Sequence, residues 1–326
     1  MLNRLLLAAS ITASISMAHA QIAPPAPTYP LKPIRMIVPF PAGGASDTSA
    51  RIVAQKLSDR LSQQILVENR PGAGGTIGAA AAAKSSPDGY TLLMGSSTEM
   101  VTSPHLYRNV PYDTVRDFAP ITLVASQPLI LVVHPSVPAK SVKELIALAK
   151  SRPNQLNVAS SGNGSTLHLA QVLFENAAKV KMVHVPYAGS PQAAVATLSG
   201  EAAVNFGTVP AVLEFVRAGR LRGLGVTSST RRTAMPNLPT VAEAGVPGYE
   251  MLIWNALFAP RDTRAEIITR LNTEVARILE APDVREAFSR LGGEVSSSSP
   301  EQLRAYVETE WVKMAKVVAA SGAKID

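Results

Sequence analysis

The sequence predicts an α/β protein with two lobes, and three observations support this fold class. Short runs rich in β-branched residues alternate with longer segments of helical periodicity along most of the chain, which is typical of a mostly parallel sheet covered by helices on both faces. The 326 residues exceed the roughly 100 to 200 residues of a usual domain, so two domains are favoured over one. A hydrophobic fraction of 46% is ample for two cores, and the absence of cysteine excludes disulfides and thiolate chemistry.

The N-terminal residues 1–20 have the pattern of a secretory signal peptide. Asn3 and Arg4 precede an apolar run over residues 5–16, and the small-residue triplet at 18–20 is typical of a cleavage site. The alternative is that this segment is retained as an anchor. Beyond it, no apolar stretch approaches the roughly 18 to 20 residues that a membrane span needs. We therefore expect an exported, periplasmic protein, in a compartment without a pool of nucleotide cofactors.

The elements follow in chain order from the alternation. Proline-rich residues 21–33 predict a tether, the apolar run 34–38 predicts the first strand, and helical spacing of small and apolar residues over 46–61 predicts the first helix. Gly219 stands where a glycine usually ends a helix. Further strands are expected at 65–67, 91–94, 121–124, 129–133, 157–159, 182–185, 203–206, 221–226 and 254–259. Further helices are expected at 76–84, 142–150, 167–178, 192–198, 211–218, 264–279, 282–291 and 300–319.

These elements divide into two expected lobes. Residues 34–125 together with 235–326 are expected to form lobe 1, and residues 126–234 are expected to form lobe 2. Lobe 1 is thus discontinuous in sequence, and the chain crosses between the lobes twice.

The first chemically informative loop, residues 39–47, leaves a strand and opens a helix. Its candidate ligand-binding residues are Ala42, Gly43, Gly44, Ser46 and Asp47. Glycines let the backbone come close to a ligand, and a helix N-terminus presents unpaired N–H groups, so the loop suits an anion. The alternative is that Ser46 or Asp47 does no more than cap the helix.

A second glycine-rich loop, residues 69–76, also precedes a helix. Gly72, Gly74 and Gly78 miss the dinucleotide-binding spacing because Ile77 occupies the position of the third glycine. A tight turn with close helix packing explains this loop as well as a ligand contact does, so no cofactor is predicted.

A third loop, residues 160–166, is expected to open the first long helix of lobe 2. Its candidate ligand-binding residues are Ser160, Ser161, Gly164, Ser165 and Thr166, which offer hydroxyl and backbone donors. An anion site in each lobe would suit a carboxylate held in the cleft between them. His168 is a further candidate for contact with the ligand, and a purely structural role is the alternative. Tyr187 is another candidate, and a place in the core is the alternative. The same two interpretations apply to Trp254.

Signals of catalysis are sparse. No serine lies in a nucleophile elbow, and the histidines after residue 20 are too far apart in sequence to predict a metal site. Asp47 and Glu99 form a conceivable acid–base pair, but the sequence does not fix their separation. We expect no catalytic residue and no metal. The net charge of +7 favours solubility or a mild attraction for anionic solutes, and without a basic cluster it does not predict nucleic-acid binding.

Several motifs together resemble the Bug (TctC-like) family of extracytoplasmic solute receptors, which serve tripartite tricarboxylate transporters. The motifs are PFPAGG at 39–44, VENRPGAGG at 67–75, PDGYTLL at 87–93, VPY at 185–187 and LPTVAEAGVPGY at 238–249. This resemblance implies a type II periplasmic binding-protein fold whose two lobes close on a ligand without catalysis.

The same resemblance implies how the ligand is held and which partners the protein has. The loops at 41–47 and 160–166 would act as pincers on the carboxylate of a small organic acid, with an acidic residue at Asp47. The receptor, expected to be a monomer, would deliver that acid to two integral membrane subunits. Many relatives carry an aspartate where this chain has Asn205, which weakens any transfer of ligand identity. The alternatives are an exported hydrolase-like enzyme and a sensor for a membrane signalling partner.

Overall fold

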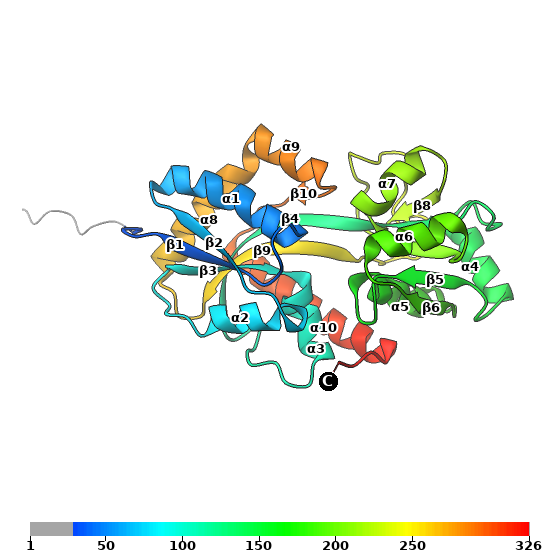
Figure 1. Cartoon of the computed structure of the whole chain (residues 1–326), viewed down its shortest axis with the longest axis horizontal. Helices are drawn as coiled ribbons and strands as arrows, with labels where there is room; N and C mark the ends of the chain where they lie inside the picture. Colours follow the sequence, from blue (N-terminus) through cyan, green and yellow to red (C-terminus); the bar gives the residue numbers. More distant parts are fainter. Residues whose placement is uncertain (1–28, 326) are drawn as a thin grey trace, which may run out of the picture.

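The computed structural model describes residues 29–325 and shows two α/β lobes joined by long strands (Figure 1). The strands form one mixed sheet in the order β2-β1-β3-β9-β4-β7-β5-β6, with β10 and β8 paired to β4. The strands are β1 (Ile34–Val38), β2 (Ile65–Asn69), β3 (Thr91–Ser96), β4 (Phe118–Val133), β5 (Asn157–Ser160), β6 (Val183–Pro186), β7 (Val204–Thr208), β8 (Arg222–Val226), β9 (Leu252–Pro260) and β10 (Glu294–Val295).

The helices match the expected ones closely, with short additions. They are α1 (Ala45–Leu61), α2 (Thr76–Ala83), α3 (Ser103–Leu106), α4 (Val142–Ser151), α5 (Thr166–Ala178), α6 (Ser190–Ser199), α7 (Val209–Arg217), α8 (Ala265–Glu280), α9 (Pro282–Arg290) and α10 (Pro300–Ser321). The sequence did not predict α3, β10, a 3-10 turn at Ala73–Gly75 or a π-helical turn at Thr98–Thr102. These four are at most five residues long, too short for a periodic pattern to reveal.

The sheet is less parallel than expected. Each lobe has three parallel strands, β2-β1-β3 in lobe 1 and β6-β5-β7 in lobe 2, but β9, β4, β8 and β10 pair antiparallel. The reason is β4, a single strand of 16 residues where two strands were expected. Its first part pairs with β9. Its last five residues pair with β7 in the other lobe, and the last four of these also pair with β8.

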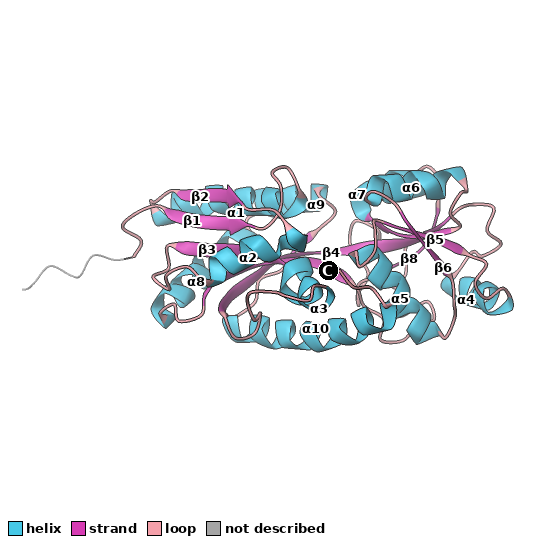
Figure 2. Ribbon diagram, turned by 60° about the horizontal axis from the view of Figure 1, so that its bottom comes forward, coloured by secondary structure: helices cyan, strands magenta, loops and turns pink. Residues whose placement is uncertain are grey.

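Helices cover both faces of the lobe 1 sheet. Ile34, Met36 and Val38 of β1 pack with α1, α8 and α9, whereas the intervening Ile37 belongs to the core on the other face with α2 and α10. Figure 2 shows α1 and α10 on opposite sides of the strands. The alternation places successive side chains of β1 in different layers, as the pleat of a strand requires.

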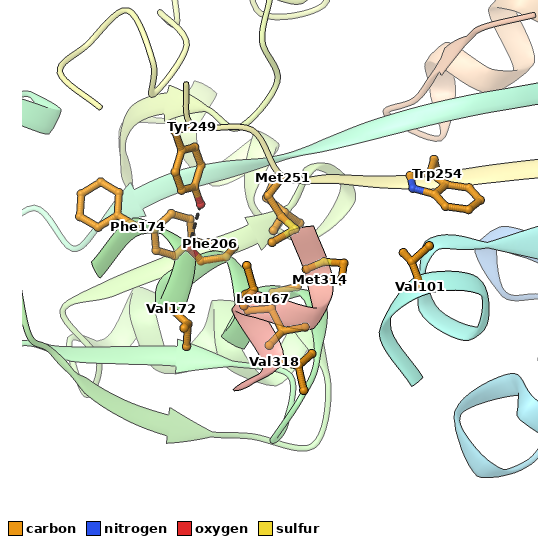
Figure 3. Close-up of a cluster of buried hydrophobic side chains, with 14 of the residues drawn as sticks. Val101, Leu167, Val172, Phe174, Phe206, Tyr249, Met251, Trp254, Met314 and Val318 are labelled. Atoms are coloured by element: carbon orange, nitrogen blue, oxygen red, sulfur yellow. Dashed lines mark hydrogen bonds between the residues drawn. The ribbon is translucent and has the colours of Figure 1, made fainter. Parts of the chain in front are cut away.

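One hydrophobic core is continuous between the lobes. It includes Val101 of lobe 1, Phe174 and Phe206 of lobe 2, and Met314 of α10. In Figure 3, Met314 lies between Leu167 and Val101. The C-terminal helix α10 therefore packs on both lobes, and a capping box between Ser299 and Gln302 fixes its start.

The predicted lobe boundaries remain a proposal, which the contacts refine. Met235 packs with Val226 and other residues of lobe 2, Thr240 pairs with Val226, and the Tyr249 hydroxyl donates to the Ala170 carbonyl. We therefore propose that the chain returns to lobe 1 near Leu252 and not at residue 235. The expected signal peptide lies outside the described residues, as does the tether up to residue 28; the Tyr29 hydroxyl donates to the carbonyl of Gly89 in lobe 1.

Candidate ligand-binding site

Both candidate loops lie at the end of their lobe that faces the other lobe. β3 ends where Ser96 pairs with Asn255, near the start of β9, and β7 ends where Thr208 pairs with Leu129 in the middle of β4. β1 is parallel to β3, and β5 is parallel to β7, so the loops that follow β1 and β5 leave their sheets on this same side. The two loops therefore open toward the space between the lobes.

The first loop exposes its backbone at the start of α1. Ala42, Gly43 and Gly44 are exposed, and α1 begins at Ala45 with Gly44 as its N-cap. Gly43 has a φ of +81°, a conformation that glycine adopts without steric cost, and no atom lies within 4 Å of a Cβ placed there. The first backbone N–H groups of α1 have no acceptor within the helix, so they are available to an anion.

Asp47 holds the first loop in shape from within lobe 1. Only 2% of the residue is exposed. Its carboxylate accepts hydrogen bonds from the Gly43 backbone N–H at 2.8 Å, from Arg51 Nε at 2.9 Å and from Asn69 Nδ2 at 2.9 Å. Asn69 Nδ2 also donates to the carbonyl oxygen of Phe40 at 2.9 Å. Burial alone would raise the pKa of Asp47, but these hydrogen bonds and the Arg51 charge outweigh burial and lower it to about 2.

Neither Ser46 nor Asp47 caps α1, contrary to the capping alternative, because the helix has no side-chain cap. The hydroxyl oxygen of Ser46 instead accepts a hydrogen bond at 2.9 Å from Asn255 Nδ2 on β9. Sequence reasoning missed Asn255, although a polar residue inside the apolar run 254–259 was a usable signal. A cavity of about 30 Å³ lies beside this contact, lined by Ala45 and by Gln127 of β4 among others, and it has room for a water molecule.

The second loop presents a matching set of donors at the start of α5. Ser165 is the N-cap, and its side chain accepts a hydrogen bond from the His168 backbone N–H. Its own hydroxyl proton therefore remains available, as do the first-turn N–H groups of Thr166 and Leu167. Ser161, Ser165 and Thr166 are partly exposed. The arrangement resembles the first loop and is equally suited to a carboxylate.

The buried residues of the second loop hold it through contacts within the protein. Ser160 is fully buried, and its hydroxyl lies 2.5 Å from His184 Nε2 and 3.2 Å from both the N–H and the carbonyl oxygen of Gly162. Gly164 is buried against lobe 1, since a Cβ there would lie 2.8 Å from Leu106 Cδ1. His168 accepts a hydrogen bond from the Gly164 backbone N–H through Nδ1.

The two aromatic candidates, Tyr187 and Trp254, lie in different parts of the structure. Tyr187 is partly exposed, and its hydroxyl donates to Glu201 at 2.9 Å. Its backbone N–H donates to the Ser160 carbonyl oxygen, which places it next to the second loop. Trp254 is fully buried in the shared core, with its ring 5.8 Å from that of Tyr306, so it is a core residue.

A further polar space between the lobes was not anticipated from the sequence. Arg232 of lobe 2 forms an ion pair with Glu294 of β10, beside a cavity of about 260 Å³ that Arg285 and Ser289 of α9 also line. No candidate residue from the sequence lines this cavity.

In the described part of the chain, no hydrogen bond or ion pair joins Asp47 and Glu99, and each carboxyl group has its own partners. Glu99 accepts hydrogen bonds from the backbone N–H and the hydroxyl of Ser96 and is fully buried. Burial raises the pKa of Glu99 from 4.5 to about 8, so the carboxyl group is mostly neutral at pH 7.

Between residues 29 and 325, no group of three potential ligands could hold a metal ion, and no helix is long and apolar enough to cross a membrane.

We expect the buried Glu99 to make stability depend on pH. Between pH 4.5 and about 8, the folded protein keeps a proton that the unfolded chain has lost, so the free energy of unfolding should fall as the pH rises through this window. Glu99→Gln keeps an acceptor and a donor for Ser96 without titrating, so its stability should fall less. Denaturant unfolding at both ends of the window measures this difference, and equal slopes in the two proteins would contradict it.

Comparisons with known proteins agree with this architecture. The family "Tripartite tricarboxylate transporter family receptor" (TctC) matches residues 49–323. The chain is 41% identical to BugT of Bordetella pertussis over 314 residues, which cover 95% of this chain and 96% of BugT. Another relative, from Pseudomonas sp. strain P51, is 39% identical, with 89% of this chain and 86% of the relative covered.

Solved structures show the same two-lobed fold. A TctC solute-binding protein from Polaromonas without ligand has a TM-score of 0.82 at 30% identity, covering 90% of this chain and 99% of that one. An R. palustris protein with adipate has a TM-score of 0.76 at 36% identity, covering 91% and 100%. MatC from Rhodopseudomonas palustris with bound malate has a TM-score of 0.71 at 32% identity, covering 89% and 100%. The family consists of solute receptors and not of enzymes, and this chain belongs to it.

Proposed function

We propose that this protein is a periplasmic receptor that captures a small organic acid between its lobes. One observation carries the proposal: two loops, one in each lobe, open toward the same interlobe space and each begins a helix with free backbone donors. Helix N-termini attract anions through these N–H groups and the helix dipole. In this proposal the contacts come from Ala42, Gly44 and the first turn of α1, and from Ser161, Ser165 and Thr166.

Other candidate residues hold the loops in shape and do not contact the ligand themselves in this proposal. Asp47 and Gly43 shape the first loop, while Ser160, Gly164 and His168 shape the second. Tyr187 borders the second loop and is the candidate for a side wall. Adipate and malate, found in two related structures, are both dicarboxylic acids, so we propose an acid of this class.

Family membership supports the remaining steps of the proposed role. The N-terminal segment 1–20 would direct export and be removed, and the monomeric receptor would deliver its ligand to two integral membrane subunits of a tripartite tricarboxylate transporter.

A thermal-shift screen of organic acids tests the proposal. A ligand that binds only the folded state stabilises it by about 2.7 kcal/mol at one hundred times its Kd, so at least one dicarboxylate should raise the Tm clearly. The diamide of the same compound is the matched control, since it keeps the shape and loses the charge. Equal stabilisation by acid and diamide would contradict a carboxylate anchor, and recovery of an altered compound would contradict a receptor.

A further inference from the structure

His168 connects the second loop to the body of lobe 2 through both its backbone and its ring. Its backbone N–H donates to Ser165 Oγ at 3.3 Å, and its Nδ1 accepts from the Gly164 backbone N–H at 3.1 Å. The residue is 6% exposed. The N-cap Ser165 and the residue before it, Gly164, are thus both bound to His168.

The bond from Gly164 fixes the protonation state of the ring. A neutral imidazole can accept at Nδ1 only when its proton is on Nε2. A second proton on Nδ1 would place an N–H group against the N–H of Gly164, so this bond exists only in the neutral ring. Gly164 has a φ of +70° and lies against Leu106, which leaves its N–H little freedom to find another acceptor.

A second histidine makes a charged ring still less favourable. The rings of His168 and His184 are stacked, with centroids 3.7 Å apart and planes at 6°. His184 in turn lies 2.5 Å from Ser160 Oγ at the other end of the loop. Two positive charges at this separation would repel each other strongly.

Among residues 29–325, no acidic group contributes to the pKa of His168 in a way that would stabilise its charged form. Glu175, further along α5, is bound to Gln171 and the Met182 N–H and pairs with Lys181. The Tyr249 hydroxyl donates to the Ala170 carbonyl, and on α10, which packs against α5, Glu310 pairs with Lys313. Tyr187 pairs with Glu201.

We propose that His168 is a positioning residue for the ligand, and that its protonation releases the second loop and weakens binding as the pH falls. This inference rests on the proposed function of the loop as half of a carboxylate site. A receptor of this kind would hold its acid at neutral pH and release it more readily in acid.

The direction in which the pKa of His168 is shifted agrees with a neutral ring that accepts from Gly164. Burial, followed by the charge of His184, lowers the pKa of His168 from 6.5 to about 4. Release of the loop that exposes the ring to water and separates it from His184 would return the ring to its ordinary pKa, so lowering the pH through this window favours the freed state.

The test compares three variants with the wild type, using adipate and malate as probes. His168→Asn places an oxygen near the position of Nδ1, so it keeps an acceptor for Gly164 and does not titrate. His168→Leu removes the acceptor. His134→Asn is the matched control, because His134 contacts Ser136 and lies away from the loop.

Affinities are measured by calorimetry from about pH 7.5 to about pH 5. The titration window of His168, from 6.5 down to about 4, overlaps this range between pH 6.5 and about 5. Wild type and His134→Asn should therefore lose more affinity than His168→Asn, by up to roughly tenfold. Protonation of the probe itself affects all proteins equally and cancels in this comparison. His168→Leu should bind at least about tenfold more weakly already at neutral pH, because the Gly164 N–H loses its partner.

Two outcomes would overturn the inference. One is an identical pH profile in wild type and His168→Asn, and the other is a nitrogen-15 NMR spectrum of the wild type showing the proton of neutral His168 on Nδ1. The NMR result does not depend on any variant folding. If wild type binds no organic acid at neutral pH, the proposed function fails; if it binds acids with His168 in the other tautomer, only this inference fails.

Discussion

Asp47→Asn is expected to destabilise lobe 1 and to weaken ligand binding together. The carboxylate of Asp47 accepts hydrogen bonds from three donors. In asparagine an NH2 group replaces one carboxylate oxygen, so a donor would face a donor at that position. Asp47 is buried while its charged partner Arg51 is half exposed, so the loss of this carboxylate should cost about 2 to 3 kcal/mol. Because the Gly43 N–H is one of the donors, the first loop should lose its shape, and affinity for the acid should fall at least about tenfold.

Denaturant unfolding and calorimetry measure the two effects. Asp283→Asn is the matched control, since it removes an exposed ion pair with Lys56 and should cost less than about 1 kcal/mol. The pKa of Asp47 is lowered to about 2 from 3.8, so its contribution should be complete above pH 3.8 and disappear as the pH falls through 2. An Asp47→Asn protein as stable as Asp283→Asn would contradict the role given to Asp47.

Gly164→Val is expected to cause the largest loss of binding among loop substitutions. Gly164 has a φ of +70°, and a Cβ would lie 2.8 Å from Leu106 Cδ1 and 3.0 Å from Cδ2. A β-branched residue would therefore be strained and would also push the second loop away from lobe 1. We expect a stability loss of about 2 to 4 kcal/mol and affinity below the detectable range.

Two comparisons separate strain from contact in this prediction. Gly43 also has a positive φ, +81°, but no atom lies within 4 Å of a Cβ placed there. Gly43→Ala should therefore lower the free energy of unfolding by only about 1 kcal/mol. Gly164→Ala should cost more, and adding Leu106→Ala should recover part of that difference. Equal costs for Gly43→Ala and Gly164→Ala would show that the contact between the lobes is unimportant.

The order of the elements could be predicted from the sequence, whereas the crossing between the lobes could not. Strands such as Ile34–Val38 and helices such as Ala45–Leu61 depend on local periodicity, which a single sequence contains. β4 was expected as two strands because Ser126 to Pro128 interrupt its apolar run. That interruption lies where β4 passes from β9 to β7, so only the tertiary pairing explains it.

For the two candidate loops, the sequence predicted that each leaves a strand and opens a helix, and the structure confirms this. Glycines and helix-starting residues identified both segments, because a loop's backbone chemistry is local. The supporting contacts were not predictable, since Asn255 reaches Ser46 and His184 reaches Ser160 from distant parts of the chain. Asp47, Ser160 and His168 were predicted to contact the ligand. In the structure their side chains bond to residues of their own loops, and we propose that they hold these loops in shape.

A crystal structure of the protein with its bound acid tests the central claim most directly. We predict one carboxylate between the first turns of α1 and α5, within hydrogen-bond reach, directly or through a water, of the N–H groups of Ala45 or Ser46 and of Thr166 or Leu167. Asp47 and His168 should keep their present partners. An acid bound elsewhere, such as in the cavity beside Arg232 and Glu294, with neither helix start contacting a carboxylate, would contradict the account.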